Sequence, residues 1–151
     1  MGQKLSNEIN NSRIGYGTTA FNAITVAVRG NGIVTLGGYA YGPVDASTAY
    51  NLAANAKGVT EVINKIHVDP PSPLDDRIRR AAYRAIYGYP QLNKYALNPV
   101  KPIRIQVDGG HVILFGAVDS ESDKQVAGIQ ANSVPGVFSV KNEIQVAGQE
   151  H

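Results

Sequence analysis

The segment "GVTEVINKIHV" at Gly58–Val68 returns later in the chain as "GVFSVKNEIQV" at Gly136–Val146. Extending this match backwards aligns "ITVAVRGNGIVTLGG", which begins at Ile24, with "IRIQVDGGHVILFG", which begins at Ile103. The second copy is one residue shorter at the turn. Identity kept at a fixed spacing over this length indicates two copies of one small domain.

Several residues that are identical in the two copies have predictable structural roles. Glycine ends helices because it adopts positive φ without strain, and short carboxylates cap helix N-termini. An asparagine on the apolar face of a strand needs hydrogen-bond partners, so we expect it to fasten the start of the last strand to a loop or helix end. The matched pairs are Gly38 with Gly116, Asp45 with Asp123 (the expected caps), Gly58 with Gly136 (the expected helix ends) and Asn64 with Asn142.

The apolar periodicity within a copy predicts a hairpin, a helix and a further strand. In the first copy, apolar residues alternate over 24–28 and 34–36, on either side of the glycine-rich turn "GNG". Small apolar residues recur at helical spacing over 49–56, and alternation resumes over 62–68. The second copy repeats this order around the turn "DGG".

A helix is expected before each hairpin. In the second copy Ser72 can cap it, Pro73 suits its first position, and Asp75 and Asp76 complement its dipole. The corresponding segment "QKLSNEINNS" of the first copy predicts a short or frayed helix. The predicted fold class is therefore α+β, with two αββαβ repeats, each a three-stranded sheet with two helices packed on one face.

The proline-rich segment "DPPSP" separates the two copies. The predicted domains are residues 1–69 and 74–147, with a linker at 70–73 and a tail at 148–151. A unit of this size is marginally stable alone, so packing of the two copies against each other would stabilise both.

The composition of the 151 residues is that of a globular protein, with 43% hydrophobic and 17% charged residues. The chain has no cysteine, which excludes disulfides and thiolate chemistry. No apolar run approaches the roughly 18 residues of a membrane-spanning helix, and no export signal is visible.

Positive charge is concentrated in the segment 74–104 of a chain whose net charge is only +2. Arg77, Arg80 and Arg84 fall on one face of the expected helix. Tyr83 and Tyr87 lie on the same expected helix, and a surface of arginine and tyrosine suits anionic phospholipid headgroups. The sequence therefore predicts a lipid-binding face at these five residues. The other basic residues of the segment are Arg79, Lys94, Lys101 and Arg104, and its other tyrosines are Tyr89 and Tyr95.

The repeated pattern resembles the BON domain, a bacterial family named for osmotically inducible and nodulation proteins. The resemblance rests on the hairpins "VRGNGIVTLGG" and "VDGGHVILFG", the alanine-bearing second helix, and the twice-written "GV-x-x-V-x-N-x-I-x-V". It implies a non-catalytic module of the bacterial periplasm or envelope that binds phospholipid surfaces, with a role in osmotic or envelope stress protection.

Three other functions remain open from the sequence. A protein-interaction or scaffold role in the envelope would use an exposed sheet face or edge strand. Small-cation binding is a further alternative, because some proteins of the family are linked to potassium. Nucleic-acid binding is disfavoured, because the chain has no GxxG loop and little net charge.

The sequence does not predict an enzyme, a metal site or a cofactor. The histidines His67, His111 and His151 share no metal-ligand spacing, and no GxSxG nucleophile motif is present. The acidic group at 119–123 fits the start of a helix better than a catalytic carboxylate pair.

Overall fold

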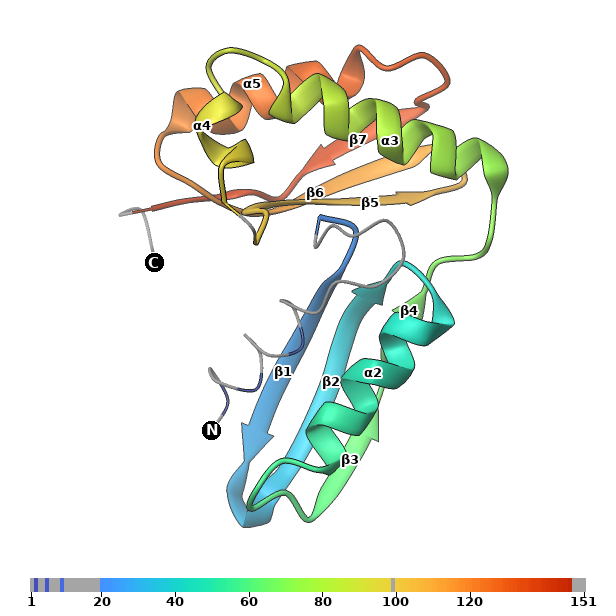
Figure 1. Cartoon of the computed structure of the whole chain (residues 1–151), viewed down its shortest axis with the longest axis vertical. Helices are drawn as coiled ribbons and strands as arrows, with labels where there is room; N and C mark the ends of the chain where they lie inside the picture. The colour runs from blue at the N-terminus through green and yellow to red at the C-terminus, as the bar shows by residue number, and fades with distance from the viewer. Residues whose placement is uncertain (1, 3–4, 6–8, 10–19, 99, 148–151) are drawn as a thin grey trace. The chain divides into compact units, whose positions relative to one another are not determined.

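The computed structural model describes residues 2, 5, 9, 20–98 and 100–147. The chain divides into two compact units, Met1–Pro70 and Pro71–His151, and the division falls within the predicted linker segment. Each unit has its own sheet (Figure 1). The two are described separately below.

Unit 1 consists of a hairpin, a helix and an interrupted last strand. Its elements are β1 (Ala23–Arg29), the 3₁₀ turn η1 (Gly30–Gly32), β2 (Ile33–Ala40), α2 (Pro43–Ala54), β3 (Glu61–Asn64) and β4 (His67–Val68). Strand β1 is antiparallel to β2, with Val26 opposite Leu36. Strands β3 and β4 both run parallel to β2 and occupy the same edge in succession.

Unit 2 repeats this order and adds a short helix. Its elements are α3 (Pro73–Tyr87), α4 (Asn93–Ala96), β5 (Ile103–Asp108), β6 (His111–Val118), α5 (Glu121–Asn132), β7 (Ser139–Asn142) and β8 (Gln145–Val146). Strand β5 is antiparallel to β6, whereas β7 and β8 are parallel to it. Helices α3 and α5 cover one face of this sheet (Figure 1). The α+β class and the repeated unit are thus confirmed.

The predicted first helix of unit 1 lies mostly outside the described residues. Gly2, Leu5 and Ile9 are helical, and the side chains of Leu5 and Ile9 are buried. They belong to one cluster with Val34 and Leu36 of the sheet. Since residues four apart share a helix face, this helix contributes an apolar stripe to the core.

The aspartates at the starts of α2 and α5 do not cap these helices, and that prediction is wrong. The N-cap of α2 is Gly42, and that of α5 is Ser120, whose hydroxyl accepts the backbone N–H of Asp123 at 3.1 Å. Asp45 and Asp123 lie one turn further in and are buried. Their carboxylates are therefore directed into the units rather than at the orphan amides of the helix ends.

The glycines at the helix ends also differ from expectation. Helix α2 has its C-cap at Asn55 and α5 at Ser133, so Gly58 and Gly136 lie three residues later, in the turn to the next strand. Both have positive φ, 87° and 93°.

Gly38 and Gly116 occupy equivalent positions in β2 and β6, next to the backbone at the start of the first strand of each hairpin. Their φ angles are 72° and 111°. A Cβ atom would lie 2.2 Å from the Ala23 carbonyl oxygen at Gly38, and 1.8 Å from the Pro102 carbonyl oxygen at Gly116. Only glycine fits here, which accounts for its presence in both copies.

The last strand of each unit is interrupted at the repeated asparagine. Asn64 ends β3 and accepts the N–H of Ile66 at 3.1 Å, and Asn142 ends β7 and accepts the N–H of Ile144 at 3.2 Å. This local turn competes with the strand ladder. The continuous strand expected over 62–68 is therefore two short strands.

Asn142 also ties this break to a helix, as its Nδ2 donates to the carbonyl oxygen of Lys124 in α5 at 2.8 Å. The expected link to a helix is confirmed in unit 2, although it lies at the strand break and not at the start of the strand. In unit 1 this prediction is wrong, because the side chain of Asn64 is exposed and its hydrogen bond within the described part of the chain is the local one from the Ile66 N–H.

Candidate functional site

Helix α3 starts as its sequence predicts. The Ser72 hydroxyl accepts the N–H of Asp75 at 3.2 Å, and Pro73 occupies the first turn. The inner face of the helix buries Ile78, Ala82 and Ile86. Because these residues face the core of unit 2, the opposite face of the helix is directed to solvent.

The acidic residues of α3 are engaged inside unit 2. The two carboxylate oxygens of Asp75 accept the backbone N–H groups of Gly109 and Gly110, each at 2.9 Å. Asp76 accepts from Nη1 of the buried Arg79 at 2.6 Å. Both acids therefore have hydrogen-bond partners within unit 2.

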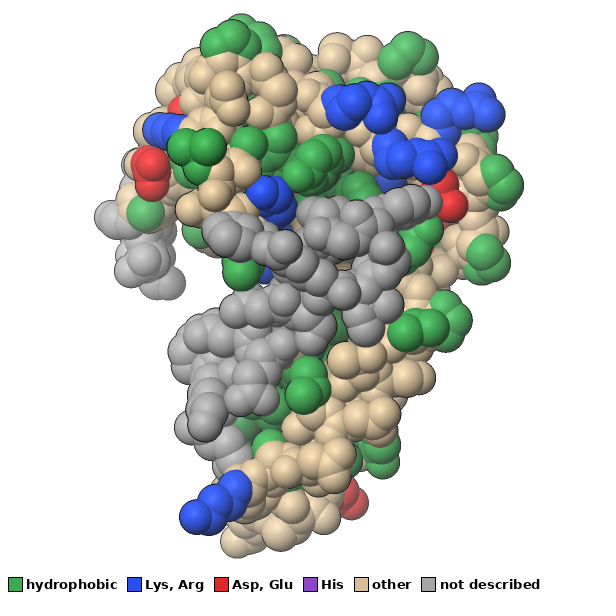
Figure 2. Space-filling view, in the orientation of Figure 1, with side chains coloured by type: hydrophobic (Ala, Val, Ile, Leu, Met, Phe, Trp, Pro, Cys, Tyr) green, Lys and Arg blue, Asp and Glu red, His purple; other side chains and the backbone are tan. Residues whose placement is uncertain are grey.

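Arg77, Arg80 and Arg84 are exposed on the outer face of α3, and we call these three residues the basic face. Figure 2 shows Lys and Arg side chains gathered over this helix. Within the described part of the chain, neither Arg77 nor Arg84 forms an ion pair. The face therefore presents guanidinium groups to solvent, with planar donor geometry suited to phosphate.

The tyrosines do not all belong to this surface. Tyr83 is half-buried, and its ring lies 4.8 Å from that of Tyr87. Tyr87 is only 3% exposed; its hydroxyl donates to the carbonyl oxygen of Ile103 at 2.6 Å and accepts the Ile103 N–H at 2.8 Å. Burial raises the pKa of Tyr87, against smaller opposing effects. The prediction that Tyr87 belongs to the lipid-binding face is therefore wrong, because this side chain lies in the core of unit 2.

Two other basic residues of the segment 74–104 make hydrogen bonds within unit 2. Arg79 is 1% exposed and donates from Nη2 to the carbonyl oxygen of Val107 at 2.6 Å. Lys101 donates to the carbonyl oxygens of Ala96 and Asn98 at 2.8 and 2.6 Å. Some of the positive charge of this segment is therefore bound within unit 2 and is not available at the surface.

The sequence did not predict the cluster of polar side chains around the buried carboxylate of Asp123. Asp123 accepts from the Tyr95 hydroxyl at 2.5 Å and from Gln91 Nε2 at 2.9 Å, and Lys94 Nζ lies 3.0 Å away. Burial alone would raise the pKa of Asp123, but these contacts together outweigh it and lower the pKa to about 2. The only indication in the sequence was that both copies have an aspartate at this position, Asp45 and Asp123.

Tyr95 completes this cluster, since its hydroxyl also accepts the backbone N–H of Asp119 at 2.8 Å. Burial is the largest of the effects that raise the pKa of Tyr95 to about 12. The three side chains that contact Asp123, those of Gln91, Lys94 and Tyr95, come from the segment between α3 and β5, so the cluster joins that segment to the start of α5.

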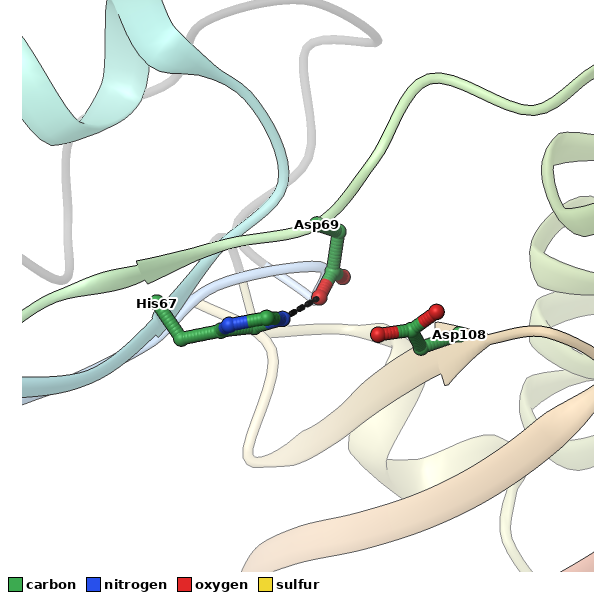
Figure 3. Close-up of side chains that lie close together, drawn as sticks. All are labelled: His67, Asp69 and Asp108. Atoms are coloured by element: carbon green, nitrogen blue, oxygen red, sulfur yellow. Dashed lines mark ion pairs between the residues drawn. The ribbon is translucent and has the colours of Figure 1, made fainter.

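His67 and His111 make polar contacts, and His151 lies outside the described residues. His67 Nε2 lies 3.6 Å from Asp69 Oδ1 in unit 1, as Figure 3 shows. Asp108, also drawn there, belongs to unit 2. In unit 2, Nδ1 of His111 lies 2.7 Å from the hydroxyl of Ser139. None of the helices among the described residues has the length and apolar character needed to cross a membrane.

Comparison with known proteins gives a family match over most of the chain. Residues 3–70 and 90–148 match the family model described as BON domain. The second match begins after α3, so the basic face lies outside it.

The chain is also similar to osmotically-inducible protein Y of Escherichia coli (strain K12). The two are 29% identical over 124 residues, which cover 75% of this chain and 57% of that protein. The matched part of the chain thus spans little more than half of its relative.

Among solved structures, two of CdsD, a structural protein of the type III secretion system of Chlamydia trachomatis, show a distant similarity. Both are 14% identical, with TM-scores of 0.37 and 0.38. They cover 82% and 95% of this chain, and 56% and 62% of their own.

Proposed function

The chain belongs to the BON domain family, and we propose that it is a non-catalytic module of the bacterial envelope that binds anionic phospholipid surfaces. A role in osmotic stress is supported by the name of its relative, osmotically-inducible protein Y. The proposal places the module in the periplasm, at the membrane surface.

The observation that carries the proposal is the exposure of Arg77, Arg80 and Arg84 while the neighbouring acids are engaged internally. Three guanidinium groups on one helix face can contact several lipid phosphates at once. Each cation close to an anionic membrane contributes about 1 kcal/mol, which gives weak binding that salt reverses. Tyr83 flanks this face and can lie at headgroup depth.

The test is co-sedimentation of the chain with anionic and zwitterionic vesicles over a range of salt concentrations. We expect binding to anionic vesicles only, decreasing as salt rises. The double variant Arg80→Glu/Arg84→Glu should lose this binding, because it reverses two of the three exposed charges.

The matched control is Arg29→Glu/Lys57→Glu, which changes the net charge equally at exposed positions of unit 1. This variant should retain most of the binding. Absence of binding to anionic vesicles at low salt would refute the lipid proposal. Equal loss in both variants would show that only total charge matters, and would refute the assignment to the basic face.

A further inference from the structure

Unit 2 exposes a large aromatic side chain in the turn between α5 and β7. Phe138 stands just before β7 and is 77% exposed. Its backbone N–H donates to the carbonyl oxygen of Gly110 at 2.9 Å, in the turn between β5 and β6. Its ring lies beside the ring of His111, with centroids 5.8 Å apart. The residue is therefore anchored through its backbone while most of its ring faces solvent.

The other copy of the repeat shows that the fold does not require a phenylalanine here. The equivalent residue of unit 1 is Thr60, and its N–H makes the same contact, to the carbonyl oxygen of Gly32 at 2.9 Å. The Thr60 hydroxyl donates to the carbonyl oxygen of Asn31 at 2.5 Å, so this side chain binds back to the turn. The backbone is thus alike in both units, and only unit 2 presents an apolar ring.

A second exposed apolar residue lies at the same end of unit 2. Leu74 is 51% exposed and precedes Ile78 by four residues, so the two share a flank of α3. Ile78 borders the turn before β7, because a Cβ atom on Gly136 would lie 3.7 Å from its Cδ1. Figure 1 shows the start of α3 and the turn before β7 at one end of this unit. We call Leu74 and Phe138 the apolar tip.

The basic face begins beside this tip. Arg77 is exposed and lies three residues after Leu74, on a neighbouring part of the helix surface. Apolar side chains next to cations are typical of surfaces that lie in the interface of an anionic membrane. A second copy of the chain fits the tip less well, because a symmetric contact would bring the two Arg77 side chains together.

We propose that the apolar tip enters the boundary between headgroups and acyl chains of an anionic membrane, while Arg77 binds the lipid phosphates beside it. This inference rests on the proposed lipid binding, and it names the turn before β7 as the point of insertion. Burial of apolar surface is not screened by salt, whereas the contacts of the exposed arginines are. The tip therefore contributes affinity that persists as the ionic strength rises.

A single introduced tryptophan can test the insertion, because the chain has none of its own. The vesicles mix phosphatidylglycerol with phosphatidylcholine, with or without bromine on the acyl chains. We expect the fluorescence of Phe138→Trp to shift to the blue on binding and to be quenched by the brominated lipid. The matched control is Leu97→Trp, at a leucine that is 84% exposed and follows α4. This tryptophan should stay in water and show neither change.

The outcomes separate the insertion from lipid binding itself, which co-sedimentation measures on the same samples. A Phe138→Trp protein that co-sediments without quenching, or equal quenching of Leu97→Trp, would overturn the insertion and leave the lipid proposal standing. Failure of the parent chain to bind anionic vesicles would overturn both. A blue shift that grows with protein concentration in the absence of vesicles would assign the tip to self-association and overturn the insertion.

Phe138→Thr provides a second test, since unit 1 has a threonine at this position and the fold should be kept, as circular dichroism can verify. The affinity for anionic vesicles should fall about fivefold to tenfold. The factor should be the same at low and high salt, because the lost contribution is apolar. Leu97→Thr is the control and should leave the affinity unchanged. An affinity that survives Phe138→Thr, or that Leu97→Thr lowers equally, would overturn the proposal.

Discussion

Asp45 and Asp123 occupy the same position in the two copies, but their carboxylates have opposite surroundings. Asp123 receives hydrogen bonds and a lysine from the segment that follows α3, which lower its pKa to about 2. Burial raises the pKa of Asp45, and a hydrogen bond with Asn22 only partly opposes this. Its Oδ1 is buried without a hydrogen-bond partner in the described structure. The same residue thus favours ionisation in one unit and protonation in the other.

These pKa shifts predict opposite effects of one substitution. Ionised Asp123 stabilises the fold above its ordinary pKa of 3.8, and this contribution is lost as the pH falls through about 2. The contribution of Asp45 is present below pH 3.8 and is lost as the pH rises through its higher folded pKa. At pH 7 we therefore expect Asp123→Asn to lower the free energy of unfolding, and Asp45→Asn to raise it, in urea titrations.

Glu61→Gln is the control for loss of one negative charge at an exposed site, and should stay within about 0.5 kcal/mol of the parent chain. The effect of Asp123→Asn should shrink as the pH falls from about 4 to about 2. The effect of Asp45→Asn should shrink at higher pH, as the pH falls from the raised folded pKa of Asp45 to 3.8. Changes of equal sign for the two aspartate variants at pH 7 would contradict this account.

At the scale of elements, the repeated asparagine connects the last strand to the preceding helix in unit 2 but is exposed in unit 1. Asn142 joins the break between β7 and β8 to helix α5 through the Lys124 carbonyl oxygen. Gly128 of α5 makes room for this contact, because a Cβ there would lie 2.9 Å from Asn142 Nδ2. In unit 1 the position equivalent to Gly128 is Tyr50, and Asn64 is exposed. The turn made by the asparagine is common to both copies.

We expect Asn142→Ala to lower the free energy of unfolding by about 1–2 kcal/mol, because it leaves backbone groups of both elements with fewer partners. Asn64→Ala should cost less. Gly128→Ala should also destabilise, and the double variant Gly128→Ala/Asn142→Ala should cost less than the sum of its parts, since both changes remove one contact. Chemical denaturation of the four variants measures this; strict additivity would show that Gly128 has a different role.

The basic face was the part of the candidate site that helical spacing could predict. Arg77, Arg80 and Arg84 share one side of any regular helix, and α3 does expose them. The same periodicity could not distinguish Arg79, whose burial depends on a carbonyl oxygen of β5. Tyr87 was assigned to the surface for the same reason. Its hydrogen-bond partner is Ile103 in β5, and sequence spacing does not show that this strand lies next to Tyr87.

At the scale of the whole molecule, each unit has its own sheet and core. Core substitutions should therefore act mainly within the unit that contains them. For Tyr95→Phe, which removes the hydroxyl between Asp119 and Asp123, we expect faster amide hydrogen exchange in α5 and β6, measured by mass spectrometry. Exchange in β1–β3 should be unchanged.

Tyr89→Phe is the matched control, because Tyr89 is 39% exposed. It should alter exchange in neither unit. If Tyr95→Phe accelerated exchange equally in both units, the unfolding of the chain would be a single cooperative event rather than two.

The sequence alone determined the duplicated αββαβ unit, its α+β class and the helix face that carries the arginines. These features follow from local periodicity and turn chemistry, which each copy repeats. Only the tertiary structure decided that Arg79 and Tyr87 close the edge of β5, that Asp123 has partners which Asp45 lacks, and that Asn142 reaches a helix. Each of these depends on which backbone carbonyl or side chain of a distant segment lies within hydrogen-bond reach, and that distance is set by packing rather than by spacing along the chain.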